Sequence, residues 1–193
     1  MTFRRVCVYC GSSTQVRPVF LEVARAFGER LARAGIELVY GGGNVGSMGA
    51  VAGGALAAGG RVIGVIPEKL MALELGRHDL GELHVVPDMH ARKKQMADLS
   101  DAFVALPGGY GTFEELFEAV TWTQLSYHHK PVGVLNVDGY YDGLEGFLRR
   151  AVDEGFVRPA HRELLLFDTD PARLLDRLGS VQLPRLEQWI DDV

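Results

Sequence analysis

The sequence predicts a single α/β domain in which a mostly parallel sheet is flanked by helices. Short apolar runs that fit buried strands alternate along the chain with runs of helical period, and glycines separate the two kinds. This alternation is typical of parallel sheets, because each parallel strand needs a crossover connection, usually a helix. The chain has 193 residues, 47% of them hydrophobic, so one core of ordinary size can form. We therefore expect residues 1–193 to form one domain.

The expected strands are apolar runs bounded by glycine or polar turn residues. In chain order they are residues 5–9, 36–40, 61–67, 83–86, 102–106, 131–137 and 164–167. Parallel strands end at the same edge of a sheet, and ligands bind beyond those ends. The loops after the strands should therefore meet on one rim.

The segments between the strands are expected to be helices. In the first of them Phe20, Phe27 and Leu31 fall on one face, and Gly35 ends it. The expected helices are 18–33, a stretch of small residues ending at 58, 89–99, a stretch ending near 128, 141–154, 171–178 and 184–191, whereas 68–82 is less regular. Helices on both faces of the sheet give a Rossmann-like fold of three layers.

Charge and hydrophobicity exclude two classes of partner. The formal net charge is −5 and the basic residues are dispersed, so we expect no nucleic-acid partner. No apolar run is long enough to span a bilayer, so we expect no membrane partner. The N-terminal residues enter a strand pattern directly and lack the layout of a signal peptide, which indicates a cytoplasmic protein.

The two cysteines, Cys7 and Cys10, form a C-x-x-C within the apolar run 6–10 that makes the first expected strand and its end. Their side chains would point to opposite faces of the sheet, unlike those of a redox or metal motif. No second Cys/His pair completes a zinc site. We therefore expect buried free thiols, with no metal and no cofactor.

A glycine-rich loop, residues 107–115 with the sequence PGGYGTFEE, joins the fifth expected strand to a helix. Its glycines allow the backbone to approach a ligand, and a helix start attracts an anion, most often a phosphate. Glu114 and Glu115 follow at once, so a catalytic acid could lie one sugar-length from that phosphate. The expected phosphate contacts are Gly108, Gly109, Tyr110, Gly111 and Thr112.

The same spacing has a plain structural interpretation. Thr112 and Glu115 also form a capping box, in which each side chain satisfies a free N–H at a helix start. In that case Glu115 would be a cap residue without a role in chemistry.

A second glycine loop, residues 41–49 with the sequence GGGNVGSMG, follows the second expected strand. Three interpretations remain open: contact with a nucleotide's phosphate or sugar, tight packing of the following helix, or dinucleotide binding. The Walker A motif is absent. For the first interpretation the contacts are Gly42 and Gly43, together with Ser12 of the loop after the first strand.

A basic stretch, Arg92-Lys93-Lys94, opens the helix after the fourth expected strand. Positive charges near a helix start oppose the helix dipole unless an anion is near. The neighbouring loop offers Glu115, and an Arg–carboxylate pair would keep Glu115 ionised. We expect Lys94 to be solvated and His90 to be a structural residue.

These residues resemble the LONELY GUY family of cytokinin riboside 5′-monophosphate phosphoribohydrolases, which are often mislabelled as lysine decarboxylases. The family's hallmark P-G-G-x-G-T-x-x-E is matched at residues 107–115, and its M-H-x-R-K element at residues 89–93. The loops at 10–13 and 41–49 are similar to the same family's first two loops. The resemblance extends over nearly the whole chain.

The resemblance implies hydrolysis of the N-glycosidic bond of an adenine-type nucleoside 5′-monophosphate, giving free base and ribose 5-phosphate. It makes Arg92 and Glu115 the catalytic pair. It also implies a homodimer or larger assembly with the active site near the subunit interface. The substrate contacts implied by the resemblance are Glu74, Arg92, Lys93, Thr121 and the loop from Gly109 to Glu115, including Glu114.

Two other classes compete with this interpretation. Related proteins of Rossmann type carry nucleotides or molybdenum cofactor without hydrolysing them, and would not need the Arg92–Glu115 pair. An NAD-linked oxidoreductase would have to fit a dinucleotide beside the second glycine loop. The sequence leaves the preferred base open, adenine or an N6-prenylated adenine.

Overall fold

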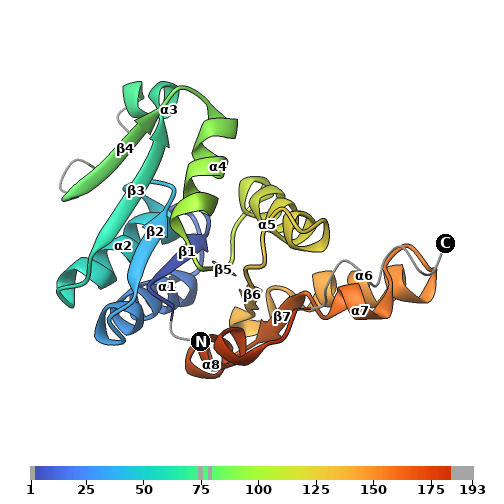
Figure 1. Cartoon of the computed structure of the whole chain (residues 1–193). Helices are drawn as coiled ribbons and strands as arrows, with labels where there is room; N and C mark the ends of the chain where they lie inside the picture. Colours follow the sequence, from blue (N-terminus) through green and yellow to red (C-terminus); the bar gives the residue numbers. More distant parts are fainter. Residues whose placement is uncertain (1–2, 74–75, 78–79, 184–193) are drawn as a thin grey trace.

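A computed structural model describes residues 3–73, 76–77 and 80–183. Its strands are β1 (Arg5–Tyr9), β2 (Glu37–Tyr40), β3 (Val62–Pro67), β4 (Glu82–Val86), β5 (Ala102–Ala105), β6 (Val132–Leu135) and β7 (Leu165–Asp168). They form one sheet in the order β4-β3-β2-β1-β5-β6-β7. Every neighbouring pair is parallel (Figure 1). The predicted α/β fold with a parallel sheet is confirmed.

Helices connect successive strands. They are α1 (Pro18–Arg33), α2 (Gly46–Ala57), α3 (Glu68–Ala72), α4 (Met89–Leu99), α5 (Tyr110–Gln124), α6 (Asp142–Asp153), α7 (Pro159–Arg162) and α8 (Pro171–Ser180), with a 3₁₀ turn η1 at Val137–Gly139. None of those in the described part of the chain is both long and apolar enough to cross a bilayer.

The sheet lies between two helical layers. Apolar residues of α1, α2 and α8 pack on one face, and those of α4, α5 and α6 on the other. Side chains alternate along β1, so Val6 and Val8 join the first core while Cys7 and Tyr9 join the second. Cys7 and Cys10 are buried free thiols on opposite faces, as predicted.

Several boundaries differ from the predicted ones. The segment after β3 begins with the short helix α3, and α7 is an additional turn that the pattern did not indicate. Helix α5 ends at Gln124 rather than near His128, because Ser126 adopts a left-handed φ of 55°. The helix predicted for 184–191 lies outside the described residues.

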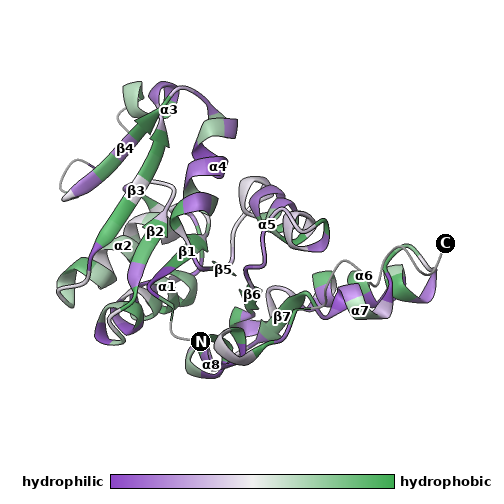
Figure 2. Ribbon diagram, in the orientation of Figure 1, coloured by the Kyte–Doolittle hydropathy of each residue, from purple (hydrophilic) through white to green (hydrophobic). Residues whose placement is uncertain are grey.

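The strand order changes direction between β1 and β5. From β1 the chain builds outward to β4 on one side, and from β5 to β7 on the other. The loops that leave β1 and β5 therefore turn in opposite directions and leave a crevice at the carboxyl ends. Figure 2 shows that β3 is mainly hydrophobic whereas α4, which borders this region, carries many hydrophilic residues.

Candidate active site

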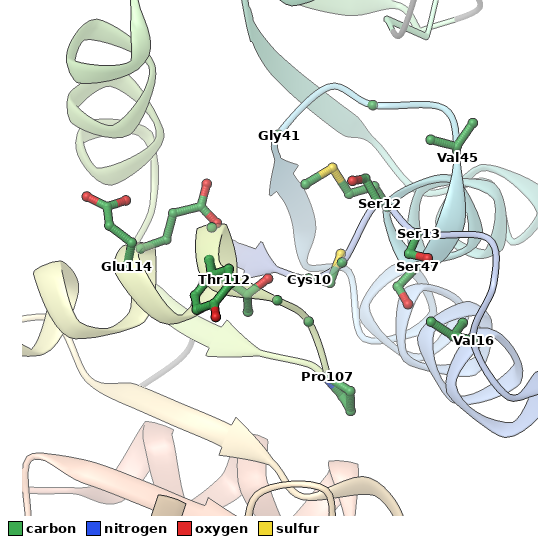
Figure 3. A pocket seen from close by; sticks show the side chains of 18 of the residues that line it. Cys10, Ser12, Ser13, Val16, Gly41, Val45, Ser47, Pro107, Thr112 and Glu114 are labelled. Atoms are coloured by element: carbon green, nitrogen blue, oxygen red, sulfur yellow. The ribbon is translucent and has the colours of Figure 1, made fainter.

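A cavity of about 760 Å³ lies at this crevice. Its wall comes from the end of β3 and from the segments that follow each of the strands β1 to β6, so the predicted loops meet on one rim. Figure 3 shows Thr112 and Glu114 on one side of it and Ser12, Ser13 and Ser47 on the other.

Arg92 is buried in the first turn of α4 and spans the strand ends. Its Nε donates to the carbonyl of Val65 at 3.2 Å, and its Nη2 donates to the carbonyl of Gly41 at 3.1 Å. Its Nη1 lies 3.5 Å from Oε1 of Glu115. These acceptors and the carboxylate offset the unfavourable place of a cation at a helix start.

Glu115 is buried in the second turn of α5 and lines the cavity. Burial raises the pKa of its carboxyl from 4.5 to about 7; Arg92 opposes this shift, while Glu114 adds to it. Desolvation outweighs the attraction to Arg92, so the pair with Arg92 does not hold the pKa of Glu115 at its ordinary value. The group is poised to exchange a proton near neutral pH.

The capping-box interpretation of Thr112 and Glu115 is also wrong. Helix α5 begins at Tyr110 with Gly109 as its N-cap, so Thr112 and Glu115 already lie inside the helix. No side chain of the described residues caps this end. The first amides of α5 therefore remain available to a ligand in the cavity.

Thr112 is buried against the glycine loop. A Cβ on Gly108 would come within 2.0 Å of the Thr112 hydroxyl and 2.9 Å of the Gly11 nitrogen. Gly11 in turn donates to the carbonyl of Pro107 at 3.3 Å. Gly108, Gly109, Tyr110, Gly111 and Thr112 all line the cavity, as the phosphate-loop hypothesis requires.

The second glycine loop has mixed roles. Gly41 has no room for a side chain, because a Cβ would lie 1.8 Å from Nη2 of Arg92. Gly46 adopts a left-handed φ of 60° and packs on the backbone of Ser12. Ser12 and Gly43 line the cavity, whereas Gly42 is buried toward Ile66 and is not part of the wall.

Lys93 is not part of the cavity wall either. Its ammonium binds the carboxylates of Glu114 and Glu118, the latter at 2.8 Å. Burial alone would lower the pKa of Lys93, but these hydrogen bonds outweigh it and the pKa is raised. Glu114 does line the cavity. Lys93 thus contacts one cavity residue and holds it in place.

Four further expectations concern individual residues. Thr121 is exposed on α5, outside the cavity wall, and Glu74 lies outside the described residues. Lys94 is exposed and pairs with Asp98 at 2.5 Å, as predicted for a solvated residue. His90, which we expected to be structural, is exposed.

The sequence did not single out several residues of the wall. Cys10, expected only as a buried thiol, directly follows β1 and lines the cavity. The hydroxyl of Tyr140, after β6, donates to the carbonyl of Gly108 at 2.6 Å. The sequence signal that could have identified Tyr140 is its position in a loop that follows an expected strand. The remaining apolar wall includes Phe20, Met48, Ile66, Leu70 and Met89.

The donor set does not suit a metal. Within the described ranges, no three His, Cys, Asp or Glu side chains gather closely enough to hold an ion.

Comparison with known proteins agrees with this arrangement. The family described as "possible lysine decarboxylase" matches residues 48–178. A probable cytokinin riboside 5′-monophosphate phosphoribohydrolase from Oryza sativa subsp. japonica is 51% identical over 91% of this chain and 72% of its own length. A cytokinin riboside 5′-monophosphate phosphoribohydrolase from Arabidopsis thaliana is 49% identical over 91% of this chain and 81% of its own length.

Solved structures share the fold at lower identity. The molybdenum cofactor binding protein of Rippkaea orientalis superimposes with a TM-score of 0.70 at 24% identity, over 93% of this chain and 98% of its own. About half of the residues are identical to those of the plant phosphoribohydrolases over most of the chain, and the family model described as possible lysine decarboxylase matches it. This chain therefore belongs to the LONELY GUY family.

Proposed function

We propose that this protein hydrolyses the N-glycosidic bond of adenine-type nucleoside 5′-monophosphates, cytokinin ribotides among them. Water adds to C1′ of the ribose, the bond from C1′ to the base nitrogen breaks, and the water's proton passes to the base. The products are free base and ribose 5-phosphate. The names of relatives with half of their residues in common support this reaction.

One observation carries the proposal: a buried carboxyl lies one helical turn beyond an uncapped helix start. Glu115 lies three residues after Thr112 on α5, so the two side chains are neighbours on one face. A phosphate at the first amides of α5 would place the ribose near Glu115. A carrier of an intact nucleotide would not need a buried carboxyl at this point.

The site fits the demands of glycoside cleavage. The reacting sugar develops positive charge, which an ionised Glu115 would stabilise strongly in a buried setting. The same carboxylate would orient water or accept its proton. Arg92 is held by hydrogen bonds to Val65 of β3 and to Gly41 just after β2, and it contacts Glu115 from that fixed position. Binding of the remote 5′-phosphate would orient the sugar, so an unphosphorylated riboside should react poorly.

Product analysis by chromatography tests the reaction. The protein is incubated with AMP, N6-isopentenyl-AMP and the two unphosphorylated ribosides, alongside the Glu115→Gln variant. We expect free base from the monophosphates only, and none from the variant. Binding of AMP without any release of base would replace hydrolysis with a carrier function.

We also propose that the chain works as a homodimer or larger assembly formed through α5. Tyr110, Phe117, Leu125 and Tyr127 on and just beyond this helix are exposed large hydrophobic residues, and Tyr110 borders the cavity. Light scattering after gel filtration would test it. Phe117→Glu should lower the measured mass, whereas Phe147→Glu, on the exposed side of α6, should not.

A further inference from the structure

We propose that Tyr140 is a positioning residue for the phosphate-binding loop, acting through the carbonyl of Gly108. This inference rests on the proposed function, because it concerns the group that holds the 5′-phosphate. Neither the glycine motif nor the comparison with relatives assigns a role to this tyrosine. Its hydroxyl donates to the Gly108 carbonyl at 2.6 Å.

The geometry of the peptide group gives this hydrogen bond its consequence. A trans peptide is planar, so its C=O and the following N–H point in opposite directions. When Tyr140 holds the Gly108 carbonyl, the N–H of Gly109 is fixed on the other side of the same plane. Glycines on both sides of this peptide leave it free to rotate otherwise. A rotated plane would present a carbonyl oxygen, rather than an N–H, to an anion.

Tyr140 is itself held by elements outside the loop. Its ring meets Phe20 of α1 edge-on with a centroid separation of 5.6 Å, and meets Tyr141 at 4.9 Å. Asp138 and Gly139 of the preceding turn have left-handed φ values of 51° and 71°. This turn brings the chain after β6 back over the loop that follows β5. The orientation of the Gly108–Gly109 peptide is therefore set by α1 and η1.

A matched pair of variants separates positioning from general packing. Tyr140→Phe keeps the ring and its contact with Phe20 but removes the hydroxyl. Tyr141→Phe removes a hydroxyl that donates to the Leu106 carbonyl at 2.8 Å, two residues earlier and outside the cavity wall. Both changes delete one hydrogen bond to the same stretch of backbone, but only the first concerns a residue that lines the cavity, Gly108.

The experiment is calorimetric titration with AMP, ribose 5-phosphate and adenosine in the Glu115→Gln background, where ligand is not consumed. We expect Tyr140→Phe to weaken AMP and ribose 5-phosphate about fivefold, the factor for a hydrogen bond of about 1 kcal/mol, and to leave adenosine unchanged. Tyr141→Phe should preserve the ratio of AMP affinity to adenosine affinity.

Three results would overturn the inference. The ratio of AMP affinity to adenosine affinity could stay unchanged in Tyr140→Phe, or it could fall equally in Tyr141→Phe. AMP could also bind no more tightly than adenosine in the parent protein. Failure of the proposed hydrolysis gives a different pattern. The parent protein could release no base from AMP while Tyr140→Phe still weakens the binding of AMP relative to adenosine. That result would support the role of Tyr140 and refute the proposed hydrolysis.

Discussion

Nη1 of Arg92 lies 3.5 Å from Oε1 of Glu115, and both side chains are almost completely buried. Nε and Nη2 of Arg92 donate to the carbonyls of Val65 and Gly41, and Nη1 also donates to the thioether of Met89. The guanidinium is therefore a fixed charge whose position is set by β3 and by the loop that follows β2. It orients Glu115 without overcoming the desolvation that raises the pKa of this carboxyl to about 7.

The first prediction concerns Gly41, whose missing side chain makes room for Arg92. A methyl group there would lie 1.8 Å from Nη2, so Gly41→Ala must displace the guanidinium. We expect kcat to fall about a hundredfold, the typical cost of misplacing a catalytic group. Gly53→Ala, on α2 with its nearest neighbour 3.6 Å away, is the control and should keep full activity. Steady-state kinetics of both variants would decide, and normal turnover in Gly41→Ala would contradict the assigned role of Arg92.

A second prediction separates two glycines of the loop before α5. Gly108 has no room for a Cβ, whereas a Cβ on Gly111 meets nothing within 4 Å. Gly108→Ala should therefore lower the melting temperature by several degrees, since the backbone must shift. Gly111→Ala should fold normally, because alanine suits the first turn of a helix. Gly111→Ala should still raise the KM for AMP, because the added methyl group would lie on the part of the cavity wall where the phosphate is expected. Thermal melts and KM values of both variants test this contrast, and an unaltered KM in Gly111→Ala would place the phosphate elsewhere.

Sequence patterns were sufficient to predict the rim but not the contacts within it. The alternation of strands and helices fixes where loops such as 107–115 must meet, because parallel strands all end at the same edge. The predicted capping box at Thr112 was wrong because the start of α5 depends on the turn at Gly109. The several glycines of this loop allow more than one position for that turn, so the sequence does not determine it. The pairing of Lys93 with Glu118, and the bond from Tyr140 to Gly108, join side chains from different elements. Only the packed structure brings such partners together.

A third prediction uses the pKa of Glu115. If the ionised carboxylate is the active form, kcat/KM should rise with pH through about 7 and then level off. Lys93 lowers the pKa of Glu115, whereas Glu114, which Lys93 neutralises, raises it. Lys93→Met should therefore move the rising limb to higher pH. Lys94→Met, which breaks only the exposed pair with Asp98, should leave the profile in place. A profile that is flat from pH 5 to 9 in the parent protein would exclude Glu115 as the titrating group.

The last prediction concerns stability, because the same shift in pKa links folding to pH. The pKa of Glu115 is about 7 in the folded chain against 4.5 for the ordinary group, so the folded state binds the proton more tightly. This contribution to stability is fully present below pH 4.5 and is lost as the pH rises through 7. By pH 9 the loss should be about 3 kcal/mol, at about 1.4 kcal/mol per pKa unit.

Glu115→Gln keeps the shape of the side chain and removes its charge, so it should remove this loss while abolishing turnover. Its free energy of unfolding in urea should match that of the parent near pH 4 and exceed it at pH 9. Glu22→Gln, at an exposed position of α1, is the control for the rest of the chain and should follow the parent at both values. Parallel pH dependence in Glu115→Gln and the parent would mean that burial of Glu115 does not oppose folding. The catalytic carboxyl would then have to be ionised at little cost, and the link between its burial and its chemistry would be refuted.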